Sequence, residues 1–389
     1  SSVCPLNRTF AHIRLYSHLI FKAMQLQITD PVYVQPEKRN AIERFFMRFI
    51  RDERDLPFAW LCLKITLIVI PFSIIMFIPG MYRWWIAVPF MAWNLGTGLG
   101  PFILMMHNTS HRKFFKKEYE FMNNYIPWVL GPFYGETPET YFGHHIVMHH
   151  VENNLSEDLS CTMNYQRDSI KDFLTYFFLF FLLGMSDLAY YFKRKERWVF
   201  LRRIMFGEIG FILMCIGLWQ ISPAATLTTF IIPFFVARFG MMAGNWAQHA
   251  FLDASDPGNS FKNSITCINT KYNHIAFNDG YHIGHHVRPN MHWTDMPGEF
   301  QKNIEKYKAN GSVVFQGIDF FQIWFFLMTK NYNKLASCYV DIRVAFNSKE
   351  EIIAFLKTRV AAIPITRGAP NVNVIFNRIP SASENQTAA

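Results

Sequence analysis

Residues 84–111 read WWIAVPFMAWNLGTGLGPFILMMHNTSH, an apolar run that ends abruptly in two histidines. The apolar part, 84–106, is long enough to cross about 30 Å of hydrocarbon as a helix. His107 and His111 follow it four residues apart, a spacing that places both imidazoles on one helix face. This stretch therefore predicts a membrane-spanning helix that presents two metal-binding side chains at one face of the membrane.

The composition of the whole chain agrees with a membrane protein. Of its 389 residues 51% are hydrophobic and 17% aromatic, and only 17% are charged, against about 25% in soluble domains. Further apolar runs cover about 58–80, 172–192, 204–220 and 224–243. The expected fold class is an all-α integral membrane protein.

The number of crossings follows from where the polar segments must meet. If the polar clusters before 172 and after 244 share one site, an even number of crossings separates them. We therefore expect 204–220 and 224–243 to form a hairpin and 172–192 to be an interfacial or re-entrant helix. The basic N-terminal arm and the basic loop 193–203 then lie on one side, and the two short turns on the other side carry only Arg83, in agreement with the positive-inside rule. The prediction is four transmembrane helices in two hairpins, both termini on the basic face, and a helical cap on the cytosolic face.

Charge and cysteine usage exclude several classes. The formal net charge is +9, but the basic residues gather beside apolar runs rather than alternating with aromatic residues, so no nucleic-acid partner is expected. Six scattered cysteines without a Cys-x-x-Cys pair exclude a disulfide framework and a zinc ribbon. Three parts are expected: a basic N-terminal arm at 1–57, a membrane catalytic domain at 58–295 and a soluble C-terminal region at 296–389.

Ten of the fourteen histidines fall into four short clusters, which read HNTSH at 107–111, HHIVMHH at 144–150, NWAQH at 245–249 and HIGHH at 282–286. The other four, His12, His18, His274 and His292, are expected to be ordinary surface or core residues. About nine clustered histidines are too many for one ion, since an octahedral site takes about six ligands. Two redox-active metals in nitrogen-rich sites point to oxygen chemistry at a strong C–H bond, because a hydrolase needs fewer ligands.

These clusters, in this order around apolar hairpins, resemble the histidine boxes of the membrane fatty acid desaturase superfamily, over about 58–295. The Asn245-x3-His249 stretch is similar to the extra motif of its acyl-CoA desaturase branch, where the Asn binds through water. The resemblance implies two iron ions and makes His144 a possible extra ligand. The ligand set that it implies is His107, His111, His145, His149, His150, His249, His282, His285 and His286, with Asn245 acting through water.

The resemblance also implies molecular oxygen as co-substrate, a lipid or acyl substrate, and an electron donor. No His-Pro-Gly-Gly stretch marks a fused cytochrome b5 domain, so a separate donor such as cytochrome b5 or ferredoxin is expected. The expected location is the endoplasmic reticulum membrane, with a plastid membrane as the alternative. Metal-bound imidazoles usually donate their second N–H to an acceptor. Asp279 is the preferred candidate, and the others are Glu152, Glu157 and Asp158.

Other functions remain open at this point. A hydroxylase on the same scaffold would act on a fatty acyl, sphingoid, alkane, sterol or carotenoid substrate. A metal transporter would need ionisable groups in the middle of the membrane, and the apolar runs contain few, such as Glu208 and Arg238. Arg238 is expected to snorkel to the interface, with contact to a substrate head group as the alternative. Helix packing is the expected role of Gly96, Gly98 and Gly100, and close approach of a lipid chain is the alternative.

Overall fold

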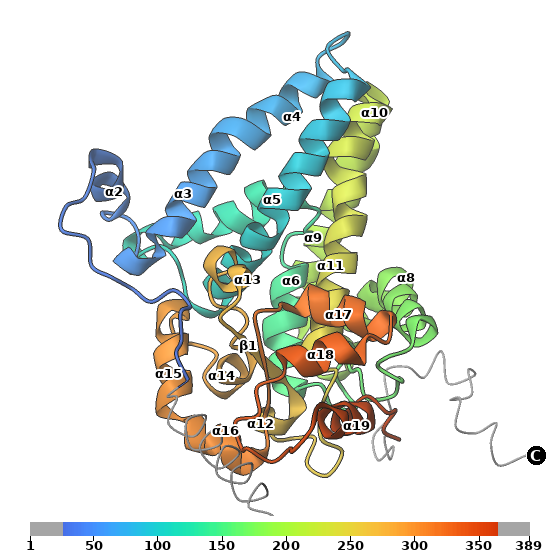
Figure 1. The fold of residues 1–389 in the computed structure, drawn as a ribbon. Helices are drawn as coiled ribbons and strands as arrows, with labels where there is room; N and C mark the ends of the chain where they lie inside the picture. The colour runs from blue at the N-terminus through green and yellow to red at the C-terminus, as the bar shows by residue number, and fades with distance from the viewer. Residues whose placement is uncertain (1–25, 365–389) are drawn as a thin grey trace, which may run out of the picture.

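The computed structural model describes residues 26–364, so His12 and His18 lie outside the described residues. Within this range the chain is mostly helical, and its single sheet has two strands (Figure 1). Five helical stretches are long and apolar enough to cross a membrane. The membrane-protein class expected from the sequence is confirmed in this coarse form. The five stretches are Glu53–Phe77 (with α3 Leu56–Lys64 and α4 Ile70–Phe77), α5 Trp84–His111, α8 Ile170–Arg194, α9 Trp198–Ile221, and Pro223–Gln248 (with α10 Pro223–Thr226 and α11 Ile232–Gln248).

Two of these stretches contain a wider, π-helical segment just before a proline. Ile65–Val69 precedes Pro71, and Leu227–Ile231 precedes Pro233. Proline has no N–H to donate and crowds the carbonyl four residues before it, which disturbs an α-helix. A π-helical turn takes up this mismatch locally, so each stretch stays one continuous helix.

Helix α8 packs differently from the other four. Near its start Phe173 packs on Trp246, close to the C-terminal end of α11. Near its end Phe192 packs on Ile204, close to the beginning of α9. Both ends of α8 therefore lie at the same end of the long helices, where α11 ends and α9 begins. One of its faces exposes apolar side chains four residues apart, namely Ile170, Leu174, Phe178 and Leu182.

Shorter elements gather at the end of the long helices where α14 lies, beneath α5 and α11 in Figure 1. The α-helices among them are α6 Thr140–Phe142, α7 His150–Glu152, α12 Ser260–Asn263, α13 Lys271–Ile275, α14 His282–Val287, α15 Met296–Lys302, α16 Ile304–Asn310, α17 Phe320–Met328, α18 Tyr332–Cys338 and α19 Lys349–Arg359. Helix α2 Ala41–Phe46 lies to the side, next to α3 (Figure 1). Tighter or wider helical turns cover Glu53–Asp55, Lys117–Asn124, Ile126–Leu130, Gly131–Tyr134, Gly143–His149 and Trp293–Asp295. We refer to these shorter elements together as the cap.

The cap draws on distant parts of the chain. Strand β1 (Ile265–Ile268) pairs in parallel with β2 (Val313–Gln316). The same hydrophobic core contains Phe251 before this pair and Leu356 after it. The fully buried Arg167 donates hydrogen bonds to carbonyls near the end of α19, including that of Ala361 at 2.6 Å. The C-terminal residues thus pack directly against elements that precede position 296.

Candidate metal centre

Nine histidines converge in two groups where the long helices meet the cap. Within each group one ring nitrogen from every member lies within 4.8 Å of the others. The first group contains His107, His111, His145, His150 and His285, and the second contains His149, His249, His282 and His286. The groups adjoin, because the ring centroids of His150 and His286 are 5.0 Å apart. The structure thus brings together all nine histidines of the expected ligand set.

The spacing of the ring nitrogens fits metal coordination better than hydrogen bonding. The Nε2 atom of His285 lies 2.9 Å from Nε2 of His107 and also 2.9 Å from Nε2 of His150. In the second group His282 Nε2 lies 3.0 Å from His286 Nε2 and 3.4 Å from His249 Nε2. An ion held about 2.1 Å from each imidazole nitrogen sets its ligand atoms about 3.0 Å apart at right angles and about 3.4 Å apart in a tetrahedron.

Unsatisfied atoms support the same conclusion. One ring nitrogen carries either one hydrogen or one lone pair, so His285 Nε2 cannot form ordinary hydrogen bonds to two other Nε2 atoms that have the same limit. The Nε2 atom of His111 is buried and has no hydrogen-bond partner among the described residues. Buried polar atoms without a partner are rare and call for an explanation such as an ion. Both groups fit a bound metal by this test.

A π-helical turn distributes the second histidine cluster between the two groups. Residues Gly143–His149 form this turn, in which backbone hydrogen bonds join residues five apart instead of four. His145 and His150 consequently lie together, with their Nε2 atoms 3.2 Å apart, while His149 joins the other group. Ordinary helical spacing would have placed His145 beside His149.

Hydrogen bonds at the other ring nitrogen orient several of these imidazoles. His149 Nδ1 donates to Asp158 Oδ2 at 2.7 Å, and His249 Nδ1 donates to the carbonyl of Asn263 at 2.9 Å. His107 Nδ1 lies 3.4 Å from Asp279 Oδ1. Such partners fix the tautomer, so that Nε2 keeps its lone pair for a metal.

The remaining acidic candidates have other contacts. Glu152 accepts a hydrogen bond from the Tyr191 hydroxyl at 2.6 Å and pairs with Lys195 at 3.3 Å. Glu157 pairs with Lys195 and with Arg194. Neither carboxylate contacts a histidine of the two groups, because both pair with basic residues at the C-terminal end of α8.

Burial favours the neutral form of several of these imidazoles. Burial, with the neighbouring imidazoles as a second cause, lowers the pKa of His145, His282, His285 and His286 well below the ordinary histidine value. Burial and His149 likewise lower the pKa of His249 to about 4. A neutral imidazole offers a lone pair to a metal, whereas an imidazolium does not.

A cavity of about 270 Å³ lies against both histidine groups. Its lining includes His107 of the first group and His149 and His282 of the second. Asn245 also lines it, and its Nδ2 donates to the Ser160 carbonyl and the Tyr176 hydroxyl. Both N–H bonds of this amide are engaged, which leaves its oxygen as the free acceptor of the side chain.

His144 belongs to neither histidine group. Its side chain lines the cavity, and its buried Nε2 has no partner among the described residues. Its ring packs edge-on to Phe180, 5.4 Å between centroids. The possible extra ligand of the second cluster therefore faces the cavity and not the two groups.

The glycines near the end of α5 serve different purposes. A Cβ at Gly98 would lie 2.7 Å from the Tyr134 hydroxyl, so this glycine permits the close packing that the sequence suggested. A Cβ at Gly100 would meet nothing within 4 Å, and Gly100 lines the cavity. The same is true of Gly240 and Gly244 on α11. These three glycines widen the cavity.

Arg238 corrects a prediction from the sequence. It does not snorkel: it is buried, with its guanidinium 3.5 Å from the centre of the Phe234 ring. It donates to the Gly135 carbonyl and the Thr137 hydroxyl and pairs with Glu208 at 3.4 Å. A buried charge requires such partners, and the loop before α6 and helix α9 provide them. No local pattern in the sequence indicates this loop as the partner.

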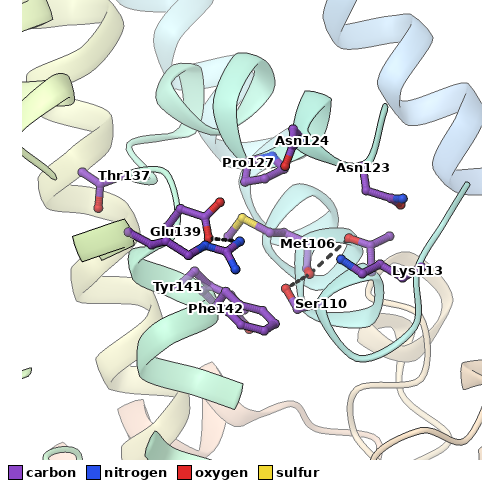
Figure 2. Close-up of a pocket in the computed structure, with 12 residues that line it drawn as sticks. Met106, Ser110, Lys113, Asn123, Asn124, Pro127, Thr137, Glu139, Tyr141 and Phe142 are labelled. Atoms are coloured by element: carbon purple, nitrogen blue, oxygen red, sulfur yellow. Dashed lines mark hydrogen bonds and ion pairs between the residues drawn. The ribbon is translucent and has the colours of Figure 1, made fainter. Parts of the chain in front are cut away.

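A smaller, polar pocket of about 100 Å³ adjoins the cavity (Figure 2). Glu139 and Arg203 form an ion pair of 2.6 Å at its wall, and Lys113 lies across from them. Thr137 and Tyr141 line both the pocket and the cavity. No sequence pattern indicates this pocket, because its lining combines residues of 106–127 and 137–142 with Arg203 on α9.

Comparison with known families identifies the fold. The model of the fatty acid desaturase family matches residues 82–317, more than half of the chain. The chain belongs to the fatty acid desaturase family. No curated protein and no solved structure shows significant similarity to it. The matched range of this desaturase-family chain contains all four histidine clusters, so the resemblance seen in the sequence is confirmed.

His274 and His292 lie apart from the two groups. His274 is exposed on α13. His292 is buried and hydrogen-bonded through both ring nitrogens, to Thr294 and Asp55. These positions agree with the ordinary surface and core roles expected for them.

Proposed function

We propose that this protein carries out oxygen-dependent desaturation of a fatty acyl chain or related lipid at a di-iron centre. One observation carries the proposal: two adjoining groups of histidines, nine side chains in all, lie at the wall of a mainly apolar cavity. Membership of the fatty acid desaturase family supports it. A mainly apolar cavity suits a hydrocarbon chain, and imidazole suits iron.

The nine histidines would hold two iron ions, five around one and four around the other. Asn245 lines the cavity beside the four-histidine group, which supports a water-mediated contact there. Bound iron would supply the oxygen-activating step that side chains cannot provide. Asp158, Asp279 and the Asn263 carbonyl would hold the imidazoles in place, and the cavity wall would position the lipid chain and exclude water.

Hydroxylation on the same scaffold is the second candidate. It would act on a fatty acyl, sphingoid, alkane, sterol or carotenoid substrate at the same histidines. The Asn245-x3-His249 stretch favours desaturation, since it is similar to the motif of the acyl-CoA desaturase branch. A metal transporter is the least favoured function, because Glu208 and Arg238 pair with each other and leave no ionisable path along α9 and α11.

We further propose four membrane crossings, with α8 lying in the interface. The packing of its two ends at one level and its exposed apolar stripe support this arrangement. The turn at Gly80 and the turn at Ser222 would then lie on the far side, where Met76 and Ala225 pack together. Tags at the two termini should be accessible from the same side, and tags found on opposite sides would contradict four crossings.

The proposal extends to the environment of the protein. A separate electron donor, such as cytochrome b5 or ferredoxin, would deliver electrons at the cap, where basic residues favour an acidic partner. The endoplasmic reticulum membrane is the proposed location, and a plastid membrane is the alternative. We also propose that the C-terminal region, 296–389, lies outside the membrane as a soluble region.

The decisive experiment is a lipid and fatty acid profile of a host that expresses this chain, compared with a host that expresses His285→Ala. New unsaturated species that are absent with the variant would establish the desaturase and locate its double bond. New hydroxylated species would show that the protein is a hydroxylase and would contradict the proposed desaturation. Stoichiometric zinc without iron in the purified protein would contradict both oxygenase functions.

A further inference from the structure

The cavity wall contains a buried carboxyl group, that of Glu136, which belongs to neither histidine group. Glu136 is 3% exposed, lies in the cavity wall, and its buried Oε1 has no hydrogen-bond partner among the described residues. A buried carboxyl without a partner destabilises a protein, because it has lost its water and gained nothing. Either a trapped water or a ligand must therefore satisfy this group.

The chain holds Glu136 so that it cannot withdraw from this position. Gly135 adopts a positive φ of +75°, and a Cβ there would lie 2.2 Å from the backbone nitrogen of Phe234 on α11. Arg238 donates to the Gly135 carbonyl at 3.1 Å, and the Glu136 N–H donates to the Gly131 carbonyl at 3.0 Å. The backbone of this loop is fixed against α11, with the carboxyl at the cavity.

Arg238 does not satisfy the Glu136 carboxyl. Its guanidinium is engaged by Gly135, Thr137 and Glu208 and covers the Phe234 ring. Burial raises the pKa of Glu136 to about 7, with Arg238 opposing and Glu208 adding to the shift. A substantial fraction of the carboxyl is therefore protonated near neutral pH, and this form has one O–H donor and free acceptor positions.

The charges nearby select the kind of ligand. An anionic group would meet two carboxyl groups and an arginine that is already paired, so an anion is disfavoured. A neutral hydroxyl both donates and accepts a hydrogen bond, which matches a protonated carboxyl. Thr137 and Thr140 also line the cavity, and the Thr137 hydroxyl, which accepts from Arg238, still has its own hydrogen to donate.

Glu136 and the histidines line the same cavity. Arg238, whose main-chain contact fixes the Glu136 loop, lies seven residues before Asn245 on α11. Seven residues correspond to about 10 Å along a helix. Both side chains line the same cavity, so one lipid chain can lie against the histidines and pass Glu136.

We propose that Glu136 and the neighbouring Thr137 form a polar subsite in the lipid cavity, which binds a hydroxyl group carried by the substrate chain at a fixed position along the chain from the reacting carbons. The inference rests on the proposed function, because it assumes that the cavity takes a lipid. It names the substrate class as hydroxyl-bearing lipids.

The test measures binding and needs no turnover. Purified full-length protein in detergent is titrated with stearic acid and with a panel of monohydroxystearic acids that carry the hydroxyl at successive positions. At least one isomer should bind about three- to tenfold more tightly than stearic acid, the range expected for one added hydrogen bond. Glu136→Leu should abolish this preference, and Glu136→Gln should keep part of it.

Thr229→Val is the matched control. Thr229 also has a buried, unpartnered hydroxyl, but it does not line the cavity, so this variant should keep the wild-type preference. Equal binding of all the fatty acids by the wild type would show that Glu136 holds only water and would overturn the subsite, while the proposed function would stand. A preference that survives Glu136→Leu would also overturn it. Absence of binding by every fatty acid would contradict the lipid function itself.

Discussion

Two buried polar clusters face one cavity, and the chain builds them in different ways. The histidine cluster comes from short motifs, in which several ligands lie within seven residues of one another. The cluster of Glu136, Glu208 and Arg238 comes from three segments separated by 30 residues or more in the chain. The first cluster has more convergent donor atoms than hydrogen bonds can use, and the second has a charge pair that satisfies itself. The comparison indicates that the histidines serve the chemistry, while the charge pair holds the cavity wall in place.

The largest expected effect follows from removing one histidine of the first group. His285 Nε2 lies 2.9 Å from two other Nε2 atoms, so His285→Ala should abolish activity and sharply reduce bound iron. Iron content and product formation are the measurements, with membrane insertion as a check on folding. The matched control is His274→Ala, because His274 is exposed on α13; an inactive His274→Ala protein would show that the ligand set is incomplete.

A smaller effect is expected from an orienting carboxylate. Asp158 accepts hydrogen bonds from His149, from the Asn154 N–H and from Ser160. Asp158→Asn keeps the shape but removes the charge that favours the required tautomer of His149. Iron affinity or activity should fall about 10- to 100-fold, measured by competition with a chelator. Unchanged affinity would mean that Asp158 has only a structural role in its loop.

A change in the cavity should alter selectivity more than rate. Gly240 lines the cavity, and a side chain added there meets open space, so Gly240→Leu should fold and shorten the lipid chain that fits. The fraction of shorter-chain product should rise several-fold in a mixed-substrate assay. Gly210→Leu on the exposed face of α9, where a Cβ also meets nothing, should leave the product profile unchanged. Identical profiles for both variants would exclude Gly240 from the substrate path.

The smallest effect on the iron centre should come from the second cluster. Arg238→Met leaves Glu208 buried without its partner, which should lower the free energy of unfolding by about 3–5 kcal/mol while iron content is retained. Thermal unfolding in detergent measures the first quantity and metal analysis the second. Arg203→Met is the control, since Arg203 is 48% exposed and its pair should contribute less. Loss of iron in Arg238→Met would show that the charge pair also supports the histidine groups, which would contradict the separate roles inferred for the two clusters.

Prediction from the sequence worked where the signal was local. Four-residue spacing placed His107 with His111, and apolar length identified the helices α5, α9 and α11 as candidate spans. The interfacial placement expected for α8 stays a prediction, since α8 also has the length and composition of a span and its orientation depends on the elements that its two ends contact. Prediction from the sequence misjudged Arg238, since an arginine near a helix end snorkels unless a distant acid and carbonyl are folded against it.

The sequence by itself determined the membrane class, the clusters of metal-binding side chains and their resemblance to the desaturase family. These features depend on hydrophobic length and on spacings within one helical turn, which the order of residues records directly. Only the tertiary structure decided that His145 lies with His150 and not with His149, because a π-helical turn changes the local geometry. It alone placed Asp158 on His149 and Glu136 at the cavity. Such contacts depend on how packed helices and loops meet in space, and no periodicity of the chain encodes them.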